Sequence, residues 1–130
     1  MSTAVFPGSF DPVTTGHVDL ICRASRMFDR LVVGVLVNSA KDPLFSQEER
    51  VAMLQEIVKD QDNITVCSFE GLLVDFVRQQ KADVIIRGLR SSGDFEYELP
   101  LAQANYKMNQ NADTVFLATA PEYSYISSSA

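Results

Sequence analysis

The sequence predicts an α/β fold with a doubly wound, five-stranded parallel sheet and helices on both faces. Apolar β-branched runs alternate along the chain with helical patterns, and neither a repeat nor a linker interrupts this alternation. The run at 30–37, RLVVGVLV, is almost continuously apolar, as is typical of strands buried on both faces. Strands that alternate with helices favour right-handed crossovers and a parallel sheet. This arrangement is Rossmann-like.

The first half of the chain supplies two strands and two helices. A strand is expected at 3–6, where the residues are apolar, and a helix follows because apolar residues recur at helical spacing over 18–28. The run at 30–37 is the second strand. In the segment 46–58, Ser46 and Glu49 have the spacing of a capping box ahead of an apolar stripe, which predicts a second helix.

The second half continues the alternation in shorter segments. Each expected strand is followed by an amphipathic helical pattern or by a polar segment. The expected strands are 64–68, 84–86 and 114–118, and the expected helices are 72–80 and 95–108.

Length and charge limit the classes of function. The 130 residues fit one domain, 1–130. A formal net charge of −6 argues against nucleic acid or an anionic membrane as a partner, since both attract positive surfaces. Cys22 and Cys67 belong to no CxxC pair or Cys/His cluster, so we expect buried thiols and no metal site. We see no signal peptide or apolar run of ~18 residues, which favours the cytoplasm.

Ligands of such sheets bind beyond the carboxyl ends of the strands, so the strand exits are the places to search. The first exit reads GSFDPVTTGH and carries His17, the single histidine of the chain, on the opening turn of a helix. A helix N-terminus favours anions, and an imidazole there adds a hydrogen-bond donor. The alternative interpretation is a surface histidine beside a helix cap.

Cationic side chains follow two further strands. Lys41 is the only cation of the loop NSAKDPLF, where a solvated lysine is the alternative. Arg87 and Arg90 follow the strand at 84–86, and guanidinium groups at a strand exit commonly bind phosphate in bidentate fashion. Surface salt bridges to acidic neighbours, Asp94 or Glu96, are the alternative for the two arginines.

The last exit reads TAPEYSYISSSA. Serines before a helix offer cap hydroxyls and free amides, a second phosphate cradle, although a disordered tail would have the same composition. Neither GxxxxGK[ST] nor GxGxxG occurs, and no nucleophile accompanies the histidine. The sequence therefore predicts a cationic phosphate pocket that works by positioning and charge stabilisation. The residues expected to line this one crevice are His17, Lys41, Arg87, Arg90 and Ser128.

The same segments resemble a known family. PGSFDPVTTGH resembles the T-x-G-H signature of the nucleotidyltransferase superfamily related to class I aminoacyl-tRNA synthetases, here Thr14, Gly16 and His17. IRGLRSSGDFEYE and EYSYISSS narrow the resemblance to the bacterial phosphopantetheine adenylyltransferases, from residue 3 to 129. The resemblance implies transfer of AMP from ATP to 4'-phosphopantetheine, with magnesium, to give dephospho-coenzyme A and pyrophosphate in coenzyme A biosynthesis. It also implies a homohexamer, with coenzyme A as a candidate inhibitor.

The resemblance assigns a role to residues at every strand exit, and it implies no dedicated metal ligands. The catalytic residues would be His17, Lys41 and Arg90. The acceptor substrate would be bound by Ser9, Lys41, Leu73 and Arg87. ATP would be bound by Ser9, Phe10, His17, Gly88, Leu89, Arg90, Glu98, Tyr123, Ser124, Tyr125, Ile126, Ser127, Ser128 and Ser129.

The chain departs from the family pattern at two places. Ser9 replaces the threonine of many relatives and keeps its hydroxyl. The sequence ends at Ala130, where the family continues into C-terminal helices, so we expect a domain without them. Two alternatives stay open at this point. One is a related enzyme, a nicotinate-mononucleotide adenylyltransferase or a glycerol-phosphate cytidylyltransferase, and the other is a non-catalytic nucleotide-binding module.

Overall fold

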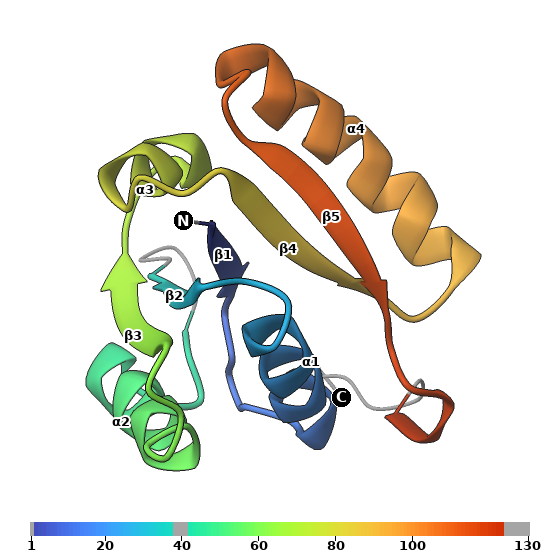
Figure 1. Ribbon diagram of the computed structural model, residues 1–130. Coiled ribbons are helices and arrows are strands. Elements are labelled where there is room, and N and C mark those ends of the chain that lie inside the picture. Colours follow the sequence, from blue (N-terminus) through green and yellow to red (C-terminus); the bar gives the residue numbers. More distant parts are fainter. Residues whose placement is uncertain (1, 38–41, 124–130) are drawn as a thin grey trace.

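The protein is described by a computed structural model at residues 2–37 and 42–123. Its five strands form one parallel sheet in the order β3-β2-β1-β4-β5 (Figure 1). The predicted fold class is confirmed. The strands are β1 (Thr3–Gly8), β2 (Arg30–Leu36), β3 (Ile64–Phe69), β4 (Val84–Leu89) and β5 (Asp113–Ala118).

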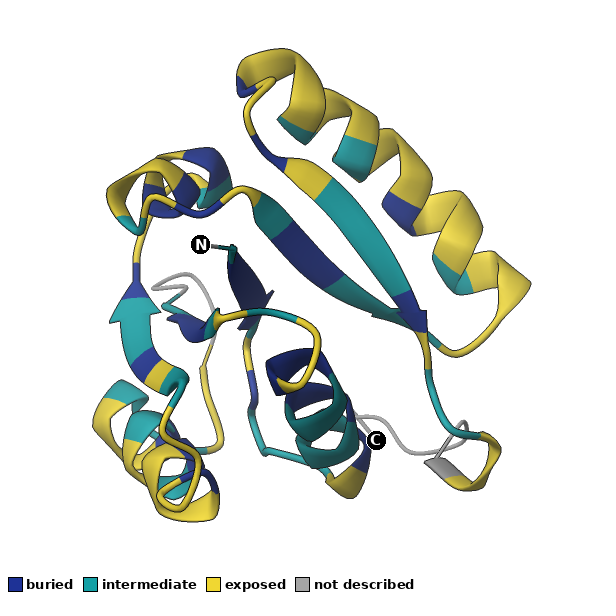
Figure 2. Ribbon diagram, in the orientation of Figure 1, coloured by how far each residue is buried: buried dark blue, intermediate teal, exposed yellow. Residues whose placement is uncertain are grey.

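Helices cover both faces of the sheet. α1 (Thr15–Ser25) and α2 (Gln47–Ile57) lie on one face, and α3 (Leu73–Gln79) and α4 (Ser92–Met108) on the other (Figure 1). The core is divided accordingly, because successive strand residues point to opposite faces. Ala4 and Phe6 pack with α1 and α2, whereas Val5 packs with α3. Figure 2 shows burial concentrated on the strands and α1, with α4 largely exposed.

The central strand β1 has different neighbours along its length. It pairs with β2 from Thr3 to Gly8 but with β4 only at Ala4 and Val5. Pro7, which has no N–H to donate to a ladder, lies beyond the last of these pairs. Strand order also reverses here, since β1 is followed by β2 on one side and β4 lies on the other. This divergence places the ligand-binding crevice expected for such sheets between β1 and β4.

Several element boundaries differ from the sequence prediction, including the following three. α1 ends at Ser25, so Met27, 54% exposed, is not on its apolar face. α4 begins at Ser92, because the Ser91 hydroxyl caps it by accepting from the Asp94 N–H. β4 extends to Leu89 through pairing with β5, so Arg87 lies within the strand and not beyond it.

The cysteines are free, but they are half-buried and not the fully buried thiols that we expected. Burial raises the pKa of the Cys67 thiol, an effect that the nearby Arg30 charge opposes. Among the helices of the described residues, none has the length and apolar character needed to cross a membrane.

Gly34 of β2 lies beneath a pair of stacked rings, and we expect Gly34→Ala to destabilise the fold. The rings of Phe69 and Phe76 stack at 4.4 Å, and a Cβ at position 34 would lie 2.7 Å from Phe76 Cε2 and 3.2 Å from Phe69 Cδ1. Overpacking of this kind costs about 1–3 kcal/mol. Urea unfolding measures the loss.

Gly93 of α4 is the matched control for this substitution. A Cβ there would meet only Ser91 Oγ, at an ordinary 3.6 Å. Gly93→Ala is therefore expected to stabilise the helix by about 0.5–1 kcal/mol. Equal effects of the two substitutions would contradict the packing argument.

Candidate active site

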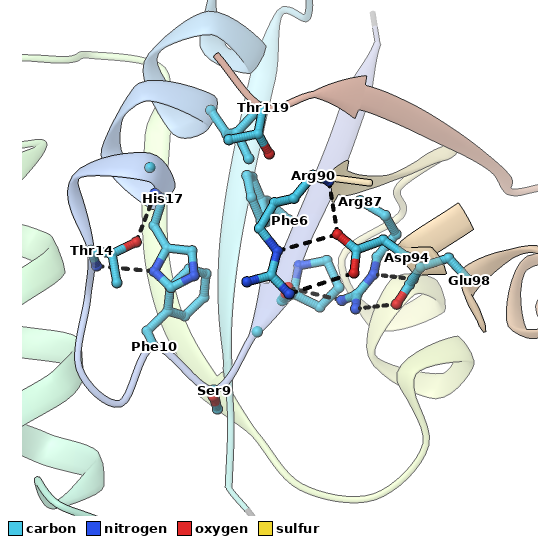
Figure 3. Close-up of a pocket in the computed structure, with 15 residues that line it drawn as sticks. Phe6, Ser9, Phe10, Thr14, His17, Arg87, Arg90, Asp94, Glu98 and Thr119 are labelled. Carbon is cyan, nitrogen blue, oxygen red and sulfur yellow. Dashed lines mark hydrogen bonds and ion pairs between the residues drawn. The ribbon is translucent and has the colours of Figure 1, made fainter. Parts of the chain in front are cut away.

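A cavity of about 260 Å³ lies at the crevice between β1 and β4 (Figure 3). Its wall is built from the end of β1 and the loop that follows, from the first turn of α1, and from β4 with the start of α4. The lining residues are Phe6, Pro7, Gly8, Ser9, Phe10, Thr14, Gly16, His17, Leu20, Arg87, Gly88, Arg90, Asp94, Glu98 and Thr119.

His17 is fixed by the helix cap on which it stands. The His17 N–H donates to Thr14 Oγ1 at 3.2 Å, and the Thr14 N–H donates to His17 Nδ1 at 3.1 Å. The two residues thus form a reciprocal capping box, with histidine in the place usually taken by Glu or Gln. The Phe10 ring meets the imidazole edge to face at 5.0 Å. The helix start therefore sets both the position and the tilt of the imidazole.

The same contacts decide which nitrogen of His17 carries the proton. Because Nδ1 accepts the Thr14 N–H, the proton of the neutral ring is on Nε2. Burial, and next the positive charge of Arg90, hold the pKa of His17 below its usual value. At neutral pH the imidazole is therefore an uncharged ring whose Nε2–H donor has no hydrogen bond to the residues that the structure describes. The helix N-terminus favours the same neutral form.

We expect an NMR titration of the free protein to give His17 a pKa below about 6.5, the usual value. His17 is the only histidine in the chain, so the signal needs no assignment. As the pH falls, the unfolded chain takes up this proton first. The contribution to stability is complete above pH ~6.5 and is lost as the pH falls through the lower folded-state pKa. A pKa at or above the usual value would contradict this description of the site.

Arg87 of β4 is held by a carboxylate of α4. Its Nε and Nη2 donate to the two Glu98 carboxylate oxygens at 2.7 and 3.0 Å, and Nη1 donates to the Pro7 carbonyl at 3.3 Å. Glu98 is 8% exposed. This bidentate geometry fixes the plane of the guanidinium. Arg87 therefore bridges β4, α4 and β1 across the crevice.

Arg90 has the corresponding partner one helical turn earlier on α4. Asp94 accepts from Arg90 Nε at 3.2 Å and from the Arg90 backbone N–H at 2.8 Å. Partial burial tends to raise the pKa of Asp94, but hydrogen bonds from Arg90 hold it below the usual value. Figure 3 shows Arg90 extending between Asp94 and His17. The arginines thus make salt bridges and line the cavity as well, although Arg87 pairs with Glu98 and not with the expected acidic neighbours.

A second cavity of about 230 Å³ adjoins the first and shares two of its residues. Arg87 and Glu98 belong to both linings, and Leu73 lies in the second only. The other lining residues of the second cavity are Leu101, Ala102, Asn105 and Thr114. The ion pair between Arg87 and Glu98 therefore forms part of the wall that the two cavities share.

The structure brings together most of the described site residues that the sequence predicts. Those that line the first cavity are Ser9, Phe10, His17, Arg87, Gly88, Arg90 and Glu98. Phe10 is only 1% exposed, because its ring lies in the core under His17. Leu89 ends β4 and lines neither cavity, and Tyr123 ends a short 3₁₀ helix, η1 (Pro121–Tyr123). Lys41 and residues 124–129 lie outside the described residues, so the predicted crevice is described for His17, Arg87 and Arg90.

Sequence reasoning missed two polar lining residues of the first cavity and one supporting residue. Asp94 and Thr119 line the first cavity, and Arg50 of α2 is buried behind it. The i, i+4 spacing of Asp94 and Glu98 on one helix was a usable signal for a pair of acidic partners. For Arg50 the signal was its spacing to Leu54 and Val58, which places it on the buried side of α2.

Comparisons with solved structures agree with this fold. The chain superposes on a lipopolysaccharide core biosynthesis protein from Thermoplasma volcanium with a TM-score of 0.69 at 23% identity, covering 92% of this chain and 98% of that one. It superposes on the Plasmodium falciparum nicotinic acid mononucleotide adenylyltransferase with a TM-score of 0.69 at 15% identity, covering 98% and 80%. At these identities the similarity concerns the fold alone.

The family model described as cytidylyltransferase-like matches residues 5–130, which together with the fold and the site places the chain in this class of nucleotidyltransferase domains. The phosphopantetheine adenylyltransferase of Lachnoclostridium phytofermentans is 54% identical over 99% of this chain and 79% of its own length. That of Clostridium perfringens is 55% identical over 100% and 79%. The chain belongs to the phosphopantetheine adenylyltransferase family.

Proposed function

We propose that this chain transfers AMP from ATP to 4'-phosphopantetheine and releases dephospho-coenzyme A and pyrophosphate. The observation that carries the proposal is the meeting of the His17 donor with Arg87 and Arg90 at one cavity, in a chain 54–55% identical to phosphopantetheine adenylyltransferases. We propose the adjoining second cavity as the place of the acceptor.

The reaction brings two anions together. One phosphate oxygen of the acceptor attacks the α-phosphorus of ATP, the bond to the β-phosphate oxygen breaks, and pyrophosphate leaves with the electron pair. Two phosphates repel each other unless cations lie between them. Arg87 and Arg90 are the described cations of the cavity, and Lys41 is proposed as a third.

His17 acts in this proposal as a hydrogen-bond donor and not as a nucleophile. Charge accumulates on the equatorial oxygens of the five-coordinate phosphorus, and a donor fixed in advance stabilises that charge most. The His17 Nε2–H fits this role because Nδ1 is already engaged by Thr14. Arg90 supports it with positive charge. The serines at 127–129 are proposed to bind the ATP phosphates, and Gly88 and Glu98 to contact ATP.

The acceptor is proposed to bind at the wall that the two cavities share. Arg87 would hold its phosphate, and the pantetheine arm would extend along Leu73 and Leu101 in the second cavity. Ser9 is the polar residue nearest to the β1 exit that could complete the phosphate site. Coenzyme A, which contains the same arm, is proposed to compete for this cavity as an inhibitor.

Magnesium is proposed to arrive on the ATP phosphates. The described residues contain no group of three or more carboxylate, histidine or cysteine side chains suited to a cation. The two carboxylates of the first cavity, Asp94 and Glu98, are bound to arginines. These residues do not fit a protein cage for the ion, whereas Mg²⁺ commonly binds through substrate phosphates and water.

We propose that the chain assembles as a homohexamer and that it is located in the cytoplasm. α4 exposes large apolar side chains that a second copy of the chain would cover, namely Phe95, Tyr97, Leu99, Leu101, Tyr106 and Met108. Free thiols at Cys22 and Cys67 fit a reducing compartment. Sedimentation equilibrium measures the assembly.

Pyrophosphate release on mixing the chain with ATP and 4'-phosphopantetheine tests the proposed reaction. Release with this pair, and not with CTP and glycerol phosphate or with ATP and nicotinate mononucleotide, is the expected result. Release with another pair would identify a related enzyme. Nucleotide binding without any pyrophosphate would indicate a non-catalytic module.

A further inference from the structure

Arg50 of α2 is a buried charge without a carboxylate partner among the described residues. It is 5% exposed. Its guanidinium donates instead to three backbone carbonyls, those of Ser9 at 2.8 Å, Leu36 at 3.3 Å and Ser46 at 3.3 Å. Burying a guanidinium is costly unless its N–H groups are satisfied. The position of this arginine is therefore tied to the positions of those carbonyls.

The carbonyls belong to segments that are far apart in the sequence. Ser9 lies in the loop after β1, Leu36 ends β2, and Ser46 caps α2. A second contact joins the same segments, this time through a side chain of the loop after β1 and the backbone that precedes α2. The Asp11 carboxylate accepts from the Leu44 N–H at 2.8 Å and from the Phe45 N–H at 2.9 Å. We call these contacts of Arg50 and Asp11 the interloop clamp.

The clamp acts on the part of the loop that faces the cavity. A peptide unit is planar and trans, so the Ser9 carbonyl and the Phe10 N–H point in opposite directions. With the carbonyl held by Arg50, the Phe10 N–H is directed away from α2, and it has no hydrogen bond among the described residues. Phe10 has a φ of 50°, a left-handed conformation that a bulky residue rarely adopts. Contacts from residues outside the turn at Ser9 and Phe10 must therefore stabilise this conformation.

The turn also supports the histidine. The Phe10 ring meets the His17 imidazole at 5.0 Å, and His17 is capped by Thr14 within the same connection between β1 and α1. Arg50 itself is not among the residues that line the cavity. Its influence on the cavity must therefore pass through Ser9 and Phe10.

We propose that Arg50 and Asp11 are positioning residues, which hold the turn at Ser9 and Phe10 in the shape that presents the Phe10 N–H to phosphate and seals one side of His17. The proposal rests on the proposed function for its kinetic consequences. Its effect on His17 in the free protein is independent of the reaction.

Arg50→Met tests the clamp, because it keeps most of the volume and removes the donors. We expect kcat/KM for ATP to fall on the order of 10–100-fold, as for other displacements of about 1 Å. In the free variant the pKa of His17 should move towards the usual value of about 6.5, since the imidazole is less well sealed. Arg50→Lys keeps the charge but can reach fewer carbonyls. Its kcat/KM and its His17 pKa should therefore lie between those of the wild type and those of Arg50→Met.

Asn63→Leu is the matched control. The Asn63 side chain also donates to two backbone carbonyls, Ser25 at 2.7 Å and Phe28 at 3.3 Å. These contacts lie at the amino ends of β2 and β3, whereas the cavity lies at the carboxyl end of β1. Asn63→Leu should lower the free energy of unfolding by about as much as Arg50→Met does. It should leave kcat/KM and the pKa of His17 at their wild-type values. If the two variants lose activity in proportion to stability, or if Arg50→Met keeps the wild-type titration, the proposal is wrong.

Asp11→Ala repeats the test if Arg50→Met does not fold. Asp11 is only partly buried, so its loss should be tolerated. The same shift of the His17 titration is expected, and an unchanged titration would overturn the proposal. A wild-type protein that transfers no AMP would refute the proposed function, while the titration of the clamp variants would still decide the role of the clamp.

Discussion

His17→Ala should lower kcat by about 10²–10³-fold, or 2.7–4 kcal/mol of barrier, with little change in KM for either substrate. In the proposed mechanism the Nε2–H donates to oxygens that become more negative only as the transition state forms. Its removal therefore affects the transition state more than the bound substrates. Steady-state kinetics measures the loss, and turnover within about threefold of wild type would make His17 an ordinary helix-start residue.

Thr14→Ala separates chemistry from helix capping. His17→Ala removes an imidazole and also half of the capping box, whereas Thr14→Ala removes the cap hydroxyl and keeps the imidazole. Loss of the cap costs about 1 kcal/mol of stability. We expect similar unfolding free energies for the two variants and a far smaller loss of kcat for Thr14→Ala. Equal losses of kcat would assign the effect to the cap.

Arg87→Ala should weaken binding of 4'-phosphopantetheine by about 10–150-fold, or 1.5–3 kcal/mol, the range for charge-assisted hydrogen bonds. ATP should lose much less, because Arg90 remains. Calorimetry with each substrate separately measures both affinities. Equal losses for the two substrates would contradict the assignment of Arg87 to the acceptor.

The ion pair with Glu98 adds an effect on folding that must be separated from binding. The Glu98 side chain is 10% exposed, and without Arg87 it becomes a buried carboxylate lacking its partner. Breaking such a pair is strongly destabilising. The double variant Arg87→Ala/Glu98→Gln should therefore recover stability without recovering affinity for the acceptor. Recovery of both would show that Arg87 has a structural role only.

The sheet was predictable from sequence because its strands are apolar and alternate with helices. The end of β4 was not, since Arg87 and Gly88 break the apolar run and only pairing with β5 carries the strand to Leu89. The position of His17 followed from its place after a strand, on the opening turn of a helix. Its protonation state did not, because it depends first on the burial of the imidazole, then on the charge of Arg90, and on the hydrogen bond from the Thr14 N–H.

The partners of the arginines were also beyond sequence reasoning. Asp94 and Glu96 are close to Arg90 in sequence, but the residue that binds Arg87 is Glu98. The helical phase of α4 relative to β4 decides this choice, and it depends on how the helix packs. Arg50 was missed for a related reason, because a charged residue on the inner side of a helix needs distant carbonyls to accept it.

The pairing of each cavity arginine with a carboxylate gives the site little net charge among its described lining residues. Two guanidinium groups face two carboxylates, and the imidazole is neutral. In a chain of formal charge −6, the described lining residues therefore supply no strong positive field that would attract polyanions from a distance. The N–H groups of the arginines act at contact range and in fixed directions. In the proposed reaction the site would therefore select a phosphate by the shape of the molecule that carries it, and negative charge alone would not be sufficient for binding.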